Sequence, residues 1–259
     1  MRYLSVLSIL VLIASSVGYP VENGKPQLVL STKTNNVKSE NDNSARIERI
    51  PDQVEGASVA RTLVKRESLT NLNTIKKIKR KDGSVRSLPV SGMEYYADCD
   101  ESGDPYLLLV DIGSSFQNIL KGSDYSLTIR AGDHPSIENV DLNYPGSIAA
   151  SPAGSPRVQL SGRLVQLTYT SPFDPELIKL ERCFLRRHPD AQLWLPHNVV
   201  SPHSSHWFRF EVDDVYFVGG FGSSAYIGEI DADLYHSVSP LPDPDNSGPL
   251  SGDDSEALL

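Results

Sequence analysis

One long strand in the last third of the chain constrains the fold more than any other stretch. Phe208, Phe210 and Val212 alternate with charged residues, which is the period of a strand with one face in a core and one in water. The apolar run 215–218 that follows is typical of a strand covered on both faces. The glycines of 219–222 then allow a bend or a close backbone approach. The sequence therefore predicts a sheet protein whose longest strand crosses the core.

Short strands and short helices account for the rest of the core. A phase slip near Gly162 predicts a β-bulge, and Asp174-Pro175 is a strong helix start. Six or so strands with long connections favour a mainly β (α+β) closed or split barrel over a doubly wound sheet. The predicted strands are 72–78, 85–96, 106–110, 125–130 and 158–169 besides the long one, and the predicted helices are 59–66, a serine-capped 114–121, and 175–187 ending at His188.

The two ends of the chain differ from its middle. Residues 1–18 have a basic start, an apolar run and small residues before Tyr19, which predicts a cleaved secretory signal peptide. The apolar run is shorter than the ~20 residues of a spanning helix, so we expect no membrane span and a place in the secretory pathway. Residues 19–54 are a polar leader and 239–259 an acidic tail, both predicted to be disordered. Residues 55–238 form one domain.

Charge limits the class of partner. The net charge of −9 argues against nucleic acid. The basic run 76–81 is the exception, and because it precedes the turn signal Asp82-Gly83, we interpret it as the solvated end of a hairpin. Binding of an anionic lipid or polyanion at that end is the alternative.

The two cysteines leave one question open. Cys99 and Cys183 lie far apart in the sequence, and an oxidising compartment permits a disulfide between them. A domain of this length does not need one, and sequence alone gives no Cα separation. Bridged and free states therefore both remain open.

Several segments, in order and with matching gaps, resemble the CREG family. These are secreted, endolysosomal proteins built on the FMN-binding split barrel that they share with pyridoxamine phosphate oxidase. No single motif is specific, but the ordered set covers nearly the whole core. The matching segments are 58–61, 118–129, 187–190 with Trp194, and 206–222.

The resemblance implies a homodimeric split barrel. In flavin-using relatives the cofactor lies at the dimer interface, whereas the CREG branch is regarded as having a pocket obstructed by loops, no flavin and no demonstrated reaction. Two features depart from animal CREG proteins. This chain has no Asn-x-Ser/Thr sequon, which puts delivery by a lectin receptor in doubt, and residues 218–222 are more similar to haem-degrading split-barrel proteins of the HugZ type.

The strand 125–130 offers the candidate face for an FMN phosphate. Ser126, Thr128 and Arg130 lie on one side of it, and Arg61 on the first helix is a further candidate. Hydroxyls and guanidinium groups are the side chains that a phosphate dianion prefers. The same pattern also fits the solvent face of a half-buried strand. The loop 132–156 decides between the two readings, because flavin is excluded if this loop covers the interface.

Other constellations are weaker. His197, His203 and His206 are close in sequence and suggest haem or zinc, but they lie in a proline-rich loop with no cysteine or carboxylate to complete a set. Asp213 and Asp214 are adjacent on a strand, so we expect them to face opposite ways. No Gly-x-Ser-x-Gly elbow is present.

We therefore predict a secreted or vacuolar/lysosomal CREG-like split-barrel protein, a homodimer that serves as a non-catalytic binding or regulatory module without a resident cofactor. The alternative is an FMN-dependent oxidoreductase of the pyridoxamine phosphate oxidase-like class, followed by a haem-binding protein. A visible spectrum separates these three.

Overall fold

The computed structural model describes residues 49–148 and 150–242. The predicted signal peptide, residues 19–48 of the predicted leader and residues 243–259 of the tail lie outside them, so the predicted domain limits stay predictions. Across the described ranges, no helix is long and apolar enough to cross a bilayer.

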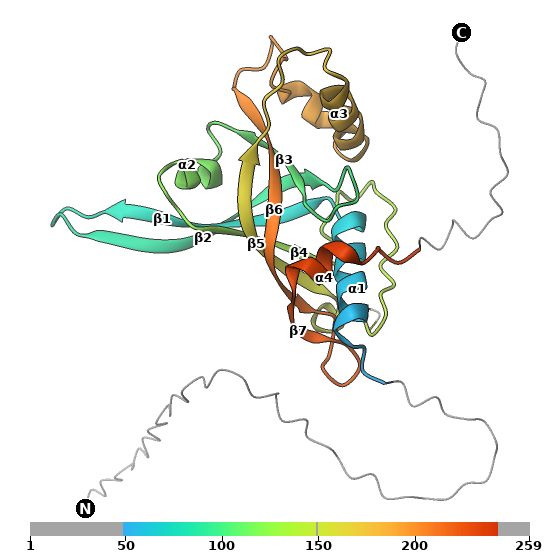
Figure 1. Ribbon diagram of the computed structural model, residues 1–259. Coiled ribbons are helices and arrows are strands. Elements are labelled where there is room, and N and C mark those ends of the chain that lie inside the picture. The colour runs from blue at the N-terminus through green and yellow to red at the C-terminus, as the bar shows by residue number, and fades with distance from the viewer. Residues whose placement is uncertain (1–48, 149, 243–259) are drawn as a thin grey trace, which may run out of the picture. The chain divides into compact units, whose positions relative to one another are not determined.

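Seven antiparallel strands form one sheet in the order β3-β2-β1-β4-β5-β6-β7 (Figure 1). Because β3 also pairs with β6, the first six strands in this order close into a barrel, and β7 extends the sheet beside β6. This closure confirms the predicted barrel and leaves no open edge on the ring of six strands. The strands are β1 (Leu69–Lys79), β2 (Val85–Ala97), β3 (Tyr106–Val110), β4 (Tyr125–Arg130), β5 (Arg157–Gln166), β6 (Ser205–Val218) and β7 (Ile227–Ile230).

The predicted bulge is present, but its extra residue lies on the partner strand. The register between β5 and β6 shifts at Ser161/Gly162, where Asp213 has no partner. A Cβ on Gly162 would lie 2.0 Å from the carbonyl oxygen of Glu211, so only glycine fits there. Beyond the bulge β5 ends at Gln166, three residues short of the predicted Tyr169.

The barrel interior is closed by helices (Figure 1). Leu63 of α1 and Tyr235 of α4 are fully buried in the same cluster as the inward residues of the strands, such as Leu72, Leu127 and Phe210. The helices are α1 (Gln53–Arg66), α2 (Ser114–Leu120), α3 (Pro175–Arg187) and α4 (Ala232–Ser237), with short 3₁₀ helices η1 (Pro152–Gly154) and η2 (Pro189–Trp194).

Two helix starts differ from the prediction. Helix α1 begins at Gln53 rather than at residue 59, because Asp52 and Glu55 form a capping box at its start. The first turn is polar, so the apolar periodicity of the sequence did not reveal it. Helix α2 is preceded by Gly113, and no side chain caps it, so the predicted serine cap is wrong.

A second, smaller cluster joins α3 to the barrel. Leu177, Leu180 and Phe184 are buried on one face of α3, as the sequence predicts, and they pack with Trp207 of β6. Cys99 and Cys183 form a disulfide with a Cα separation of 5.7 Å, which resolves the open question.

The hairpin of β1 and β2 extends beyond the rest of the barrel (Figure 1). The two strands stay in register from Leu69↔Tyr95 to Lys79↔Val85, and the turn between them contains Gly83 at φ 84°. The basic run 76–81 is thus the solvated hairpin end that the sequence predicts. Its residues are exposed or only partly covered.

Candidate functional site

A polar cavity of about 670 Å³ lies over the outer face of β1, β4 and β5. Asn73, Ser126 and Thr128 line it, together with Gln159 and Ser161. Their neighbours in each strand point into the core, so alternation places the lining residues on the outside of the barrel. Two of the four residues predicted for an FMN phosphate, Ser126 and Thr128, are therefore brought together here.

The polar groups of this cavity bind one another. Asn73 donates from Nδ2 to the hydroxyl of Thr128 at 2.9 Å and to that of Ser126 at 3.2 Å. The hydroxyl of Ser91 donates to Asn73 Oδ1 at 3.0 Å. One amide from β1 thus links the hydroxyls of β2 and β4 into a neutral network.

Arg130 lies outside the polar cavity, at the end of β4. Its guanidinium pairs with Asp133 at 2.8 Å, and the same carboxylate accepts a hydrogen bond from the Arg130 backbone N–H. The pair closes the turn after β4, and the arginine side chain is 59% exposed.

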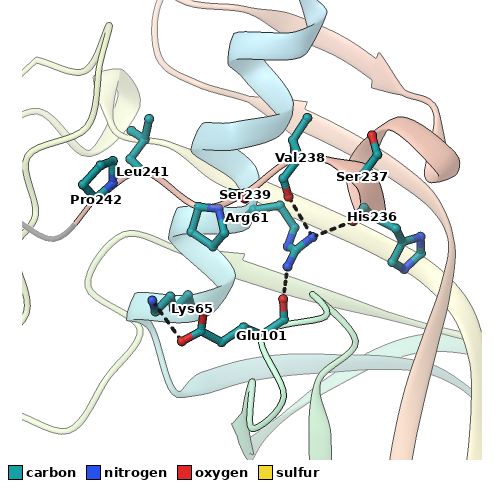
Figure 2. Close-up of a pocket in the computed structure, with 10 residues that line it drawn as sticks. Arg61, Lys65, Glu101, His236, Ser237, Val238, Ser239, Leu241 and Pro242 are labelled. Carbon is teal, nitrogen blue, oxygen red and sulfur yellow. Dashed lines mark hydrogen bonds and ion pairs between the residues drawn. The ribbon is translucent and has the colours of Figure 1, made fainter.

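Arg61 of α1 joins this helix to the turn at Glu101 and to the end of α4, as Figure 2 shows. It is 2% exposed, and its guanidinium donates to the backbone carbonyls of Tyr235 (3.0 Å), His236 (3.4 Å), Val238 (3.2 Å) and Glu101. The carbonyls at the end of α4 lack intrahelical partners, so a cation is favourable there. This side chain is engaged with backbone and lines a different cavity, of about 430 Å³, from the one that Ser126 and Thr128 line.

The loop 132–156 packs against the end of α1 and the start of β1. The Glu67 carboxylate accepts from the Gly132 backbone N–H at 2.9 Å and contacts His134 Nδ1 at 2.6 Å. Burial raises the pKa of Glu67. Arg66 binds Asp141 at 3.2 Å. None of the described residues of the loop lines the polar cavity.

The polar cavity does not fit the phosphate of FMN. A phosphate dianion needs charged donors or free N–H and hydroxyl groups. No Lys or Arg is among the described residues that line the cavity, and Asp124 adds a carboxylate to it. The hydroxyls of Ser126 and Thr128 accept from Asn73 and keep their own O–H donors, but neutral hydroxyls do not balance the charge of a phosphate dianion. We therefore derive no chemistry through a flavin at this face.

The fold brings two of the three late histidines, His197 and His206, to one cavity of about 260 Å³ and places His203 elsewhere. His197 Nδ1 pairs with Glu181 at 3.2 Å, and His206 Nε2 pairs with Asp111 at 3.0 Å, whereas His203 lines another cavity. In the described part of the chain, no three His, Cys, Asp or Glu residues are arranged to hold a metal ion.

Asp213 and Asp214 correct the prediction from strict alternation. Both side chains are exposed, while Val212 and Val215 on either side are buried. The bulge at Asp213 shifts the phase, so the two carboxylates share the outer face instead of facing opposite ways.

A further cavity, which the sequence did not reveal, lies beside α2. It has a volume of about 580 Å³, and we call it the apolar cavity. Glu94 of β2 is part of its wall, and burial raises the pKa of this carboxyl to about 7, although a hydrogen bond with the Ser115 hydroxyl opposes the shift. Its other lining residues are Leu109, Val110, Ile112, Gly113, Phe116, Leu193, Trp194, Ser201, Pro202 and His203. They come from four separate segments, which share no local motif.

A six-stranded antiparallel barrel with short helices and a polar outer face defines the class of split-barrel proteins. The model of the CREG beta-barrel family matches residues 51–237. The chain belongs to this family.

One solved structure agrees on the fold, and a second is similar at a lower score. A heme-binding protein from Mycobacterium smegmatis is 20% identical, with a TM-score of 0.50, over 71% of this chain and 61% of its own. This chain thus spans about three fifths of that protein. The heme storage protein HutZ from Vibrio cholerae is 12% identical, with a TM-score of 0.38, over 62% of this chain and 89% of its own. No curated protein matches the sequence.

Proposed function

We propose that this protein is a non-catalytic split-barrel binding module of the secretory pathway, released or delivered to a vacuolar/lysosomal lumen, and that it acts as a homodimer. The observation that carries the proposal is the neutral network of Asn73, Ser126 and Thr128. This face offers neutral hydrogen-bonding groups to a partner surface, and no Lys or Arg is among the described residues that line it.

Two features support an oxidising and acidic lumen. The Cys99–Cys183 disulfide is of the kind that persists outside the cytosol. Burial raises the pKa of Glu94 to about 7 and that of Asp98 to about 6. Carboxyls with raised pKa values bind protons on folding, so the native state gains stability as the pH falls through these values. A protein with this pattern suits a mildly acidic compartment.

The destination is tested by expressing the full chain with a C-terminal fluorescent tag in a eukaryotic cell, beside a variant that lacks residues 1–18. We expect the full chain in the medium or in acidic vesicles and the shortened chain in the cytosol. Cytosolic fluorescence from both would contradict the secretory part of the proposal.

The homodimer follows from the family resemblance and is tested by light scattering on the purified protein. We expect a mass twice that of the mature chain. Thr128→Arg places a cation and a larger side chain on the outer face of β4, and we expect it to shift the mass toward the monomer. Arg86→Gln, on the exposed hairpin, is the matched control. A wild-type monomer at micromolar concentration would refute the dimer.

The alternatives are an FMN-dependent oxidoreductase and a haem-binding protein. Absorbance spectra of the secreted protein after incubation with FMN or with haemin, followed by desalting, distinguish them. We expect neither flavin bands nor a Soret band. Retained flavin would favour the oxidoreductase, and a sharp Soret band would favour a haem protein, in line with the printed description of the Mycobacterium smegmatis structure.

A further inference from the structure

The apolar cavity is enclosed by side chains from three directions. Leu109 lies near the end of β3, Phe116 lies on α2, and Trp194 ends η2. Phe116 is itself 6% exposed and packs edge-on against Phe208 at 5.3 Å, so it forms a fixed wall. A volume of about 580 Å³ is within the range of small-molecule sites, roughly 300–1,000 Å³.

One acidic group lies in this apolar wall. Glu94 is held by the buried Ser115 of α2, and Gly92 leaves the space that the hydroxyl needs, since a Cβ there would lie 2.4 Å from Ser115 Oγ. Among the described residues Glu94 has no ion pair, and no Lys or Arg lines the cavity. A carboxylate in such surroundings lacks a counter-charge.

We propose that the apolar cavity binds a small amphipathic molecule whose protonated amine pairs with Glu94 and whose apolar part lies against Phe116 and Trp194. The amine supplies the missing counter-charge and donates hydrogen bonds to a carboxylate that can accept several. The aromatic faces favour both the cation and the hydrocarbon. An anionic ligand is disfavoured, because it would bring a second negative charge to Glu94.

The charge state of Glu94 makes this binding dependent on pH. Its pKa is about 7, so the ionised form that attracts the amine predominates above neutrality and is lost in acid. α2 and β3 carry no charged side chain, and the nearby Asp111 and His206 pair with each other at 3.0 Å. His203 is the other titratable lining residue, and a positive charge on it would repel the amine as well.

This inference deepens the proposed binding function by naming a ligand class and a direction of transport. In a secretory route that ends in an acidic lumen, the amine would be bound at neutral pH and released in acid. The site itself does not depend on that route. If the ligand class proposed here is wrong, the proposed dimer and localisation are not affected.

The test is a titration of the purified disulfide-bonded protein with 4-phenylbutylamine, followed by calorimetry and by tryptophan fluorescence. Trp194 is one of only two tryptophans, so Trp194→Phe identifies its share of the signal. The neutral 4-phenylbutanol and the anionic 4-phenylbutyrate are matched ligands. We expect the amine to bind best at about pH 8 and about tenfold more weakly at about pH 6, as the ionised fraction of a carboxyl with pKa about 7 falls.

Glu94→Gln keeps the shape and removes the charge. We expect it to weaken amine binding at least about tenfold at about pH 8 and to abolish the pH dependence, while the alcohol binds equally to both proteins. His203→Gln should retain the pH dependence. Equal amine affinity in wild type and Glu94→Gln, tighter binding of the butyrate, or no amine binding at millimolar concentration would each overturn the proposal. Thermal unfolding of each variant confirms that it is folded.

Discussion

The polar cavity and the apolar cavity differ in how their polar side chains are paired. On the outer face of β1, β4 and β5, Asn73 joins the hydroxyls of Ser126 and Thr128 in a neutral network. Beside α2, Glu94 is partly buried, with the Ser115 hydroxyl and an apolar wall around it. The first region links its neutral polar groups to one another, whereas the second has a carboxyl with no counter-charge among the described residues that line its cavity.

The difference teaches where a ligand should be sought in this fold. A face of hydroxyls and amides that are linked by their own hydrogen bonds gains less from a small polar ligand, although its remaining O–H groups can still meet a partner surface. An isolated carboxyl in an apolar cavity gains a great deal, because the partner relieves a desolvated charge. Judged by residue types alone, the polar cavity would be the better candidate for a ligand site and the apolar cavity the poorer one.

The largest expected effect comes from the β-bulge beside the polar cavity, at Gly162. Gly162→Ala places a Cβ 2.0 Å from the carbonyl oxygen of Glu211, where backbone must move and the β5–β6 pairing is disturbed. We expect a loss of at least about 3 kcal/mol in the free energy of unfolding, measured by chemical denaturation. The matched control is Gly92→Ala, two residues before Glu94 on β2. Its new Cβ meets chiefly the rotatable hydroxyl of Ser115, so the change should cost about 1 kcal/mol. Similar losses in the two variants would contradict this contrast.

The pH dependence of stability is the next largest effect. Glu94 has a pKa of about 7 in the folded protein against 4.5 for the free side chain, so folding takes up a proton and stability rises as the pH falls through this window. At about 1.4 kcal/mol per pKa unit, Glu94 alone contributes roughly 3 kcal/mol between about pH 8 and about pH 4.5. The pKa of about 6 for Asp98 acts in the same direction, and the lowered pKa of the buried His188 opposes it.

Glu94→Gln isolates that contribution. Because the variant carries no buried charge at about pH 8, its Tm there should exceed the wild-type Tm by about 5 °C or more. Its advantage should shrink toward pH 5, where the wild-type carboxyl is protonated. A constant difference across the range would mean that the Glu94 charge is solvated rather than buried.

The neutral network should show a smaller effect. Asn73→Ala removes the donor to Thr128 and Ser126 and the acceptor for Ser91, which should cost about 1 kcal/mol. Asn71→Ala, two residues earlier on the same strand, is the control, since Asn71 makes no side-chain hydrogen bond in the described part of the chain. Denaturation midpoints that agree between the two variants would argue against the network.

The smallest effect is expected at Arg130. Its pair with Asp133 is mostly in water, and exposed ion pairs contribute little, so Arg130→Ala should change stability by no more than about 0.5 kcal/mol. Asp133 keeps its hydrogen bond to the backbone N–H. A loss above about 1 kcal/mol, seen as a fall in the unfolding midpoint, would give Arg130 a role beyond closing this turn.

Local patterns predicted the local parts of the fold. Strands β3 and β4 have the predicted bounds, and Asp174-Pro175 starts α3 as expected. The phase slip also located the bulge, although it did not show which strand holds the extra residue. β7 and α4 were missed, because segments of four and six residues contain too few repeats of either period.

The candidate site depended on contacts that no local pattern contains. Arg61 has the chemistry of a phosphate ligand, but its partners are backbone carbonyls more than 170 residues away and at Glu101. The burial of Glu94 results from β2, α2 and η2 meeting at one place. The sequence predicted that Ser126 and Thr128 share a face, since they alternate on one strand. It could not predict that the Asn73 amide of a neighbouring strand donates to both hydroxyls.

The Cys99–Cys183 bond makes the middle of the chain a closed covalent ring, because 84 residues separate its two ends. The long loop 132–156 lies inside this ring. A protease that cuts the loop therefore opens the ring without dividing the molecule, and the two pieces stay joined, heavier only by the water of hydrolysis, until the disulfide is reduced. Cleavage in this loop therefore releases no fragment from the oxidised protein.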